Sequence, residues 1–204
     1  DLDTMALSMD LPRLIITGAS GFIGRHLLDS LKDRYRIVGM ARRSQARSGA
    51  PVHPNITWFQ VDIGDREPLA AAFRAIRDTG GAEVLIHLAA HYDFTGENHP
   101  EYWRTNVVGL RNVLEERRAL ALRRFGFASS VAACDFPPPG GALTEASPPD
   151  GDHIYAVTKR RGEEMLAEFD DIPSCIVRFA ALFSDWCEYP PLYFFLETWL
   201  SRAW

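Results

Sequence analysis

Short apolar runs along this chain alternate with longer segments whose apolar residues recur every three or four positions. The runs predict β-strands at 14–17, 36–41, 56–62, 82–90, 124–130 and 174–182. The periodic segments at 21–33, 65–76, 101–121 and 154–169 have the spacing of amphipathic helices. This alternation predicts an α/β fold: a doubly wound parallel sheet of the Rossmann type, with helices on both faces and ligands at the carboxyl ends of the strands.

The charge balance and the cysteines narrow the class of protein. The 204 residues include 22 Lys and Arg against 27 Asp and Glu, a formal net charge of −5, which argues against a nucleic-acid partner. No apolar run is long enough to span a bilayer, so we expect no membrane partner. Cys134, Cys175 and Cys187 form neither a disulfide framework nor a metal motif, and we expect reduced thiols, a cytoplasmic protein and no metal site.

The stretch TGASGFIG, residues 17–24, follows the first strand and opens the first helix. Gly18 would permit a tight turn, Gly21 the close approach of a pyrophosphate, and Gly24 the packing of the helix on the strand. The helix N-terminus would offer unpaired N–H groups to the phosphates. We interpret the stretch as a dinucleotide-binding turn; the alternative is a purely structural turn.

The end of the second strand bears on the choice of nucleotide. Folds that prefer NAD place a carboxylate there for the ribose 2′-hydroxyl. This chain has Ala41 followed by Arg42 and Arg43. Two guanidinium groups suit the 2′-phosphate of NADP, so the pattern favours NADP, with NAD as the second choice. The alternative is that both arginines are solvated loop residues.

The stretch YAVTK places Tyr155 and Lys159 one turn apart on a predicted helix. A free tyrosine has a pKa near 10 and is a poor base at neutral pH, but a neighbouring ammonium group stabilises its phenolate. The spacing therefore predicts an acid/base pair; the alternative is an ordinary surface pair on a helix.

These motifs together resemble those of a known superfamily. TGxxGxxG at 17–24, HLAA at 87–90, the Ser129–Ser130 pair and YxxxK at 155–159 are similar to motifs of the short-chain dehydrogenases/reductases. From about Leu14 to Phe183 the chain resembles the extended branch, the NAD(P)-dependent epimerase/dehydratase family. The resemblance implies an NADP-dependent oxidoreductase or epimerase that passes hydride between nicotinamide and a carbonyl or carbinol carbon, with a nucleotide-sugar as the expected substrate. An NADP-dependent reductase of a small non-sugar ketone or aldehyde, and a non-catalytic NADP-binding sensor or scaffold, are the alternatives.

The resemblance also assigns roles to residues at matching positions. Ser130 would bind the substrate oxygen, with Ser129 as its rival, and Tyr155 would be the acid/base. Lys159 would hold the nicotinamide ribose and tune Tyr155, while Asn106 would support the active-site backbone and its water. With the two arginines included, the expected cofactor-binding residues are Gly18, Ser20, Gly21, Phe22, Ile23, Arg42, Arg43, Asp62, Ile63, Leu88, Ala89, Ala90, Tyr155 and Lys159.

Two loop residues and three departures from the family pattern concern the substrate. His91 and Tyr92, after the fourth strand, are candidate substrate contacts, with ordinary loop packing as the alternative. Val131 and Ala132 stand where similar 4,6-dehydratases carry an Asp-Glu pair, which argues against that reaction. Cys134 replaces a frequent Tyr, and Ala181 replaces the Asn that is usual after the sixth strand.

The resemblance further predicts the organisation of the chain. We expect a disordered leader at 1–10, an NAD(P)-binding Rossmann domain at 11–183, and at 184–204 the start of a substrate-binding lobe that is largely missing. Helices 101–121 and 153–169 are expected to pair with their copies in a homodimer, as in similar proteins.

Overall fold

The computed structural model describes residues 11–93, 95–184 and 190–201. The predicted leader at 1–10 and Cys187 lie outside the described residues. Cys134, which is buried, and Cys175, which is exposed, are free thiols.

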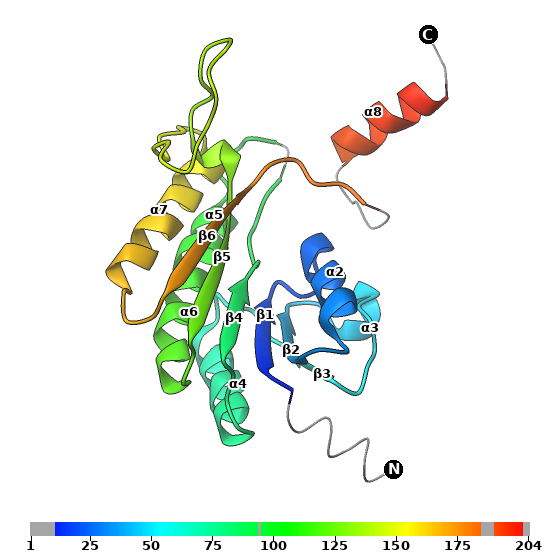
Figure 1. Ribbon diagram of the computed structural model, residues 1–204, viewed down its shortest axis with the longest axis vertical. Coiled ribbons are helices and arrows are strands. Elements are labelled where there is room, and N and C mark those ends of the chain that lie inside the picture. Colours follow the sequence, from blue (N-terminus) through cyan, green and yellow to red (C-terminus); the bar gives the residue numbers. More distant parts are fainter. Residues whose placement is uncertain (1–10, 94, 185–189, 202–204) are drawn as a thin grey trace.

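Six parallel strands form one sheet at the centre of the molecule (Figure 1). Their order is β3-β2-β1-β4-β5-β6, so the chain leaves β1 in one direction and returns to its other side at β4. The strands are β1 (Arg13–Thr17), β2 (Arg36–Ala41), β3 (Ile56–Gln60), β4 (Val84–His87), β5 (Arg124–Ser130) and β6 (Ser174–Phe179). This arrangement confirms the predicted doubly wound sheet, and its reversal point lies between the carboxyl ends of β1 and β4.

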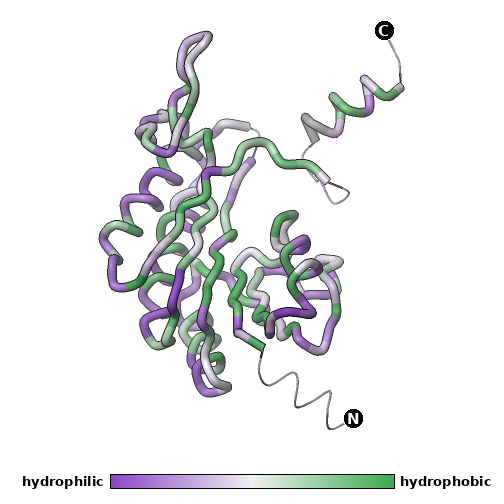
Figure 2. Tube along the Cα trace, in the orientation of Figure 1, coloured by the Kyte–Doolittle hydropathy of each residue, from purple (hydrophilic) through white to green (hydrophobic). Residues whose placement is uncertain are grey.

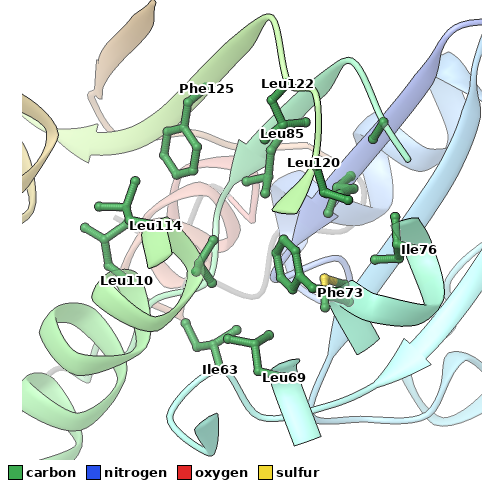
Figure 3. Packing of buried hydrophobic residues seen from close by; sticks show 14 of the residues in the cluster. Ile63, Leu69, Phe73, Ile76, Leu85, Leu110, Leu114, Leu120, Leu122 and Phe125 are labelled. Carbon is green, nitrogen blue, oxygen red and sulfur yellow. The ribbon is translucent and has the colours of Figure 1, made fainter. Parts of the chain in front are cut away.

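Helices cover the sheet on both faces, as predicted. On one face lie α2 (Phe22–Leu31) and the short α3 (Gln45–Ser48), and on the other lie α4 (Arg66–Asp78), α6 (Leu110–Glu116) and α7 (Ile154–Glu168) (Figure 1). Each face has its own apolar core, because the central strands are buried on both sides. Figure 3 shows the larger core, in which Leu110 and Leu114 of α6 lie opposite Leu85 and Phe125 of the sheet.

The segment 101–121 is less regular than its periodicity predicts. It consists of α5 (Pro100–Trp103), a π-helical turn η1 (Arg104–Gly109), α6 and a 3₁₀ turn η2 (Arg117–Ala119). Gly109 lies so close to the loop after β3 that a Cβ there would be 2.7 Å from Cδ1 of Ile63. The wide turn thus lets the backbone pack directly on this loop, and π-turns are frequent where a helix serves a site.

The ends of several other elements also differ from the predicted ones. The strand predicted at 82–90 ends at His87, because the following residues turn toward the glycine-rich stretch. The strand predicted at 174–182 ends at Phe179, opposite the residue where β5 also ends. The segment 42–55, between the second and third predicted strands, contains α3, which is capped by Ser44 and stopped by Gly49 in a left-handed conformation.

The C-terminal part of the described chain is apolar and exposed. Helix α8 (Pro190–Leu200) shows many hydrophobic residues, whereas α4 and α7 carry hydrophilic residues on their outer sides (Figure 2). Phe194, Phe195 and Leu200 of α8 and Val177 of β6 are large exposed apolar side chains. Among the described residues, no helix combines the length and apolarity needed to cross a membrane.

Candidate active site

The glycine-rich turn connects β1 to α2 and leaves room where side chains would otherwise stand. Gly18 has φ +70°, and a Cβ on it would lie 2.6 Å from the backbone nitrogen of Ala89. A Cβ on Gly24 would lie 2.5 Å from the carbonyl oxygen of Gly18. Gly21 is the residue before α2 and provides no side-chain cap, so the first N–H groups of the helix remain available to an anion. The turn therefore fits the pyrophosphate of a dinucleotide.

A cavity of about 390 Å³ lies beside this turn, at the carboxyl ends of β1, β2 and β3; we call it the glycine-turn cavity. Ten of the predicted cofactor residues line it: Gly18, Ser20, Gly21, Arg42, Arg43, Asp62, Ile63, Leu88, Ala89 and Ala90. The structure adds Met40, Ala41, Val61 and Thr105. The other four predicted cofactor residues, Phe22, Ile23, Tyr155 and Lys159, line a neighbouring cavity, which is described below.

Ion pairs form the polar rim of the glycine-turn cavity. Arg104 binds Asp62 at 3.0 Å and Asp65 at 2.7 Å, and these hydrogen bonds raise the pKa of its guanidinium above the ordinary value. Arg42 pairs with Glu101 at 3.3 Å. Sequence reasoning missed Arg104 and Glu101, because their partners lie far away along the chain and no local spacing connects them.

A second cavity of about 730 Å³ adjoins the first; we call it the tyrosine cavity. Leu88 and Ala90 line both cavities, which joins them along the carboxyl edge of the sheet. Besides Leu88 and Ala90, the tyrosine cavity brings together six predicted site residues, namely Phe22, Ile23, Tyr92, Ser130, Tyr155 and Lys159.

Tyr155 stands at the start of α7 among other aromatic rings. Its ring centroid is 4.8 Å from that of Tyr92 and 6.5 Å from that of Tyr102. Burial, and then the two neighbouring phenols, raise the pKa of Tyr155 to about 12, while a hydrogen bond with Ser130 lowers it. In this state the phenol is protonated at neutral pH and can donate a proton.

Lys159 lies one turn further along α7 and is buried. Its Nζ donates a 2.7 Å hydrogen bond to the carbonyl oxygen of Ala128 and lies 5.5 Å from the centre of the Tyr155 ring. Burial lowers the pKa of Lys159 to about 8, and Glu163 acts in the opposite direction. The predicted pairing of an ammonium group with the phenol is therefore present in the structure.

The structure distinguishes between the two adjacent serines. Ser129 is buried and donates a 2.6 Å hydrogen bond to Oε1 of Glu163, which Arg178 also binds. Ser130 is the serine that hydrogen-bonds Tyr155. Both serines line the tyrosine cavity, but the hydroxyl group of Ser129 belongs to a buried network with Glu163 and that of Ser130 does not.

Asn106 joins three segments behind the site. Its Oδ1 accepts a 2.7 Å hydrogen bond from the backbone nitrogen of His91, and its Nδ2 donates to the His91 carbonyl and to Thr158. Thr158 in turn donates to the carbonyl of Tyr155. Asn106 therefore connects the loop after β4 to α7, and its predicted role in an active site stays a prediction.

The two candidate substrate contacts, His91 and Tyr92, have different surroundings in the structure. Tyr92 lines the tyrosine cavity, whereas the His91 side chain packs within its loop, 3.2 Å from Asp93 and against the ring of Tyr102. His91 is absent from the linings of both cavities in the described part of the chain. Across the same ranges, no cluster of His, Cys, Asp and Glu could hold a metal ion.

His87 is a residue whose role sequence reasoning missed. It is buried at the end of β4, and its Nδ1 is 2.9 Å from Oγ1 of Thr17, the first residue of the glycine-rich stretch. Burial lowers its pKa to about 3. A neutral histidine thus links β4 to the start of the glycine-rich turn. The motif HLAA alone does not predict this contact.

Comparisons with known proteins show which sequences the chain is similar to. The chain is 32% identical over 125 residues to a 3 beta-hydroxysteroid dehydrogenase/Delta 5-->4-isomerase of Mycobacterium tuberculosis, covering 61% of this chain and 33% of the relative. It is 28% identical over 129 residues to a UDP-glucose 4-epimerase of Streptococcus mutans, covering 61% and 37%. The matches thus span about a third of the length of these relatives.

Solved structures share the fold. The Bordetella bronchiseptica enzyme WbmG, solved with NAD and UDP, matches with a TM-score of 0.80 at 21% identity, covering 95% of this chain and 61% of that one. A UDP-galactose 4-epimerase matches with a TM-score of 0.73 at 26% identity, covering 94% and 63%. The model of one family, described as the NAD dependent epimerase/dehydratase family, matches residues 14–191, and the chain belongs to that family.

Proposed function

We propose that this chain is the cofactor-binding part of an NAD(P)-dependent oxidoreductase that interconverts a carbonyl group and a secondary alcohol. The observation that carries the proposal is the tyrosine cavity, where Ser130, Tyr155 and Lys159 meet beside the glycine-rich turn. The nicotinamide, when bound, supplies or accepts the hydride.

The side chains act on the proton. In the reducing direction Ser130 orients the substrate oxygen, and Tyr155, whose pKa is raised to about 12, donates its hydroxyl proton to that oxygen. In the oxidising direction the phenolate must accept the proton, and the buried ammonium group of Lys159 favours this charged form. We also expect Lys159 to hold the nicotinamide ribose, and Asn106 to keep the loop after β4 in place.

For the cofactor we propose NADP ahead of NAD. Support comes from Arg42 and Arg43 in the lining of the glycine-turn cavity and from Ala41 at the position where a carboxylate would bind a 2′-hydroxyl. NAD remains the second choice, because the solved relative WbmG was crystallised with NAD.

For the substrate we propose an alcohol or ketone with an apolar body. The tyrosine cavity is lined by Phe22, Phe136, Phe179 and Leu182, and its charged lining residue in the described chain is Lys159, which already binds Ala128. A nucleotide-sugar would need cationic partners for its diphosphate. The similarity to a steroid dehydrogenase supports the apolar class. A nucleotide-sugar remains the second candidate because epimerases are also among the relatives.

The test is a comparison of Tyr155→Phe with Tyr92→Phe in the purified protein. Oxidation and reduction of the nicotinamide are followed with a 3-ketosteroid, a small aromatic ketone and UDP-glucose. We expect kcat to fall about 10²–10⁴-fold in Tyr155→Phe, with cofactor affinity kept, because the proton donor is lost. Tyr92→Phe should lose much less. Unchanged turnover in Tyr155→Phe would contradict the oxidoreductase and favour a sensor or scaffold.

We further propose that the protein forms a homodimer through helices 101–121 and 153–169. Trp103 and Val108 are 42% and 48% exposed on the first of these segments, which supports an apolar contact there. Sedimentation velocity should show a dimer for the native chain and a monomer for Val108→Asp. A monomeric native chain would contradict the proposal.

A further inference from the structure

Glu101 and Arg42 meet at the rim of the glycine-turn cavity although 59 positions separate them in the chain. Nη1 of Arg42 lies 3.3 Å from Oε2 of Glu101. Arg42 follows β2 and lines the cavity, while Glu101 belongs to α5, which approaches from the loop after β4. The carboxylate that is missing from the end of β2 is therefore replaced, beside the same cavity, by one from another element.

The carboxylate of Glu101 is held in place by the π-helical turn η1 that follows α5. Oε2 accepts a 3.0 Å hydrogen bond from Oγ1 of Thr105, and Oε1 lies 3.4 Å from Nη1 of Arg104. Arg104 also binds Asp62 and Asp65, so it keeps two partners when Glu101 is neutralised. Neutralising Glu101 therefore changes the charge next to Arg42 and leaves the rest of the rim paired.

The two arginines after β2 have different roles. Arg43 donates a 2.7 Å hydrogen bond to the carbonyl oxygen of Ser20, which attaches its guanidinium to the glycine-rich turn. The Arg42 side chain is 54% exposed, and its ion pair in the described structure is the one with Glu101. Arg42 is thus the guanidinium that can exchange one anionic partner for another.

We propose that Glu101 lowers the selectivity for NADP over NAD by acting as an internal counter-ion of Arg42. A 2′-phosphate must displace the carboxylate from Arg42, whereas a 2′-hydroxyl need not. Glu101 therefore weakens the binding of NADP and leaves the binding of NAD unchanged. This inference rests on the proposed position of Arg42 at the 2′ group of the cofactor.

The test measures the affinities of NADP⁺ and NAD⁺ by calorimetry for the native protein, Glu101→Gln, Arg42→Ala and the double variant. We expect Glu101→Gln to bind NADP⁺ about two- to fivefold more tightly, the range of a partly exposed ion pair, with NAD⁺ affinity unchanged. The gain should disappear in the Arg42→Ala background, which is the double-mutant criterion for a direct coupling. Glu115→Gln is the control, since it removes the same charge from a pair with Arg66 on α4.

The outcomes separate the inference from the proposed cofactor preference. If the native protein prefers NADP⁺ and loses this preference in Arg42→Ala, but Glu101→Gln leaves NADP⁺ affinity unchanged or lower, the inference is overturned and the preference stands. If the native protein prefers NAD⁺ but Glu101→Gln shifts it toward NADP⁺ only when Arg42 is present, the preference is wrong and the inference stands. If Arg42→Ala alters neither affinity, both are overturned.

Discussion

At the glycine-turn cavity the charged side chains are partly exposed, whereas at the tyrosine cavity they are buried. Arg42, Glu101 and Arg104 form ion pairs that solvent reaches, and a ligand group can replace one of their partners. Lys159 and Glu163 are almost inaccessible. Exposed ion pairs contribute about 0–1 kcal/mol, whereas breaking a buried pair costs about 3–5 kcal/mol. The ion pairs of the glycine-turn cavity can therefore adjust the affinity for a ligand, whereas the buried groups at the tyrosine cavity keep the neighbouring side chains in one arrangement.

The largest expected effect is at Glu163, beneath the tyrosine cavity. Glu163 accepts hydrogen bonds from Ser129 and from Nε and Nη2 of Arg178. Glu163→Ala should lower the free energy of unfolding by about 3 kcal/mol, because it leaves the Arg178 charge and the Ser129 hydroxyl without this acceptor. Urea denaturation measures the change.

Glu164→Ala is the matched control on the same helix. Glu164 is half exposed and pairs with Arg161 at 3.0 Å. Glu164→Ala should lower the free energy of unfolding by less than about 1 kcal/mol. Equal effects of the two substitutions would contradict the distinction between buried and exposed pairs.

Between about pH 5 and 6 an intermediate effect is expected at His87, and it grows as the pH falls. The pKa of His87 is about 3 in the folded protein, below the ordinary 6.5, so the unfolded chain binds more protons between these values. The stability associated with neutral His87 is complete above pH 6.5 and decreases as the pH falls toward 3, by up to about 1.4 kcal/mol per pH unit.

Unfolding free energies measured between pH 4 and 8 test this dependence. In His87→Asn the unfolding free energy should change less steeply with pH below 6.5. The slope should decrease by up to about 1.4 kcal/mol per pH unit, which corresponds to one bound proton. His53→Asn, which removes a partly exposed histidine from the loop before β3, is the control and is measured in the same way. An unchanged slope in His87→Asn would show that His87 does not cause the acid sensitivity.

The smallest effect is expected at Asp65, on the rim of the glycine-turn cavity. Asp65 pairs with Arg104 at 2.7 Å, but both side chains are exposed. Asp65→Asn should lower the free energy of unfolding by less than about 1 kcal/mol at low salt. The difference from the native protein should vanish near 1 M salt, where the Debye length is about 3 Å. A salt-independent loss above this value would mean that the rim behaves like the buried network.

The strongest sequence-based predictions concern short-range spacing. The order of strands and helices along the chain and the doubly wound parallel class of the sheet were predictable, because apolar periodicity distinguishes strands from helices. Tyr155 and Lys159 were predictable because one helical turn separates them. The glycines were predictable because a tight turn before a helix needs residues without Cβ atoms.

Contacts across the fold were not predictable in this way. The hydrogen bond from Ser129 to Glu163, which distinguishes Ser129 from Ser130, joins residues 34 positions apart. The ion pair between Arg42 and Glu101 joins residues 59 positions apart. Nothing in the spacing of 101–121 disclosed the π-turn that packs on Ile63.

The α/β class, the glycine-rich turn and the candidate pair Tyr155 and Lys159 follow from the amino-acid sequence alone, since these depend on neighbours within one or two turns of chain. The folded structure was needed to show which serine joins the Glu163 network, which partner each arginine after β2 has, and that His87 is neutral. Each of those properties depends on burial and on the charge of residues far away in the chain, and these arise when the sheet and its helices pack together.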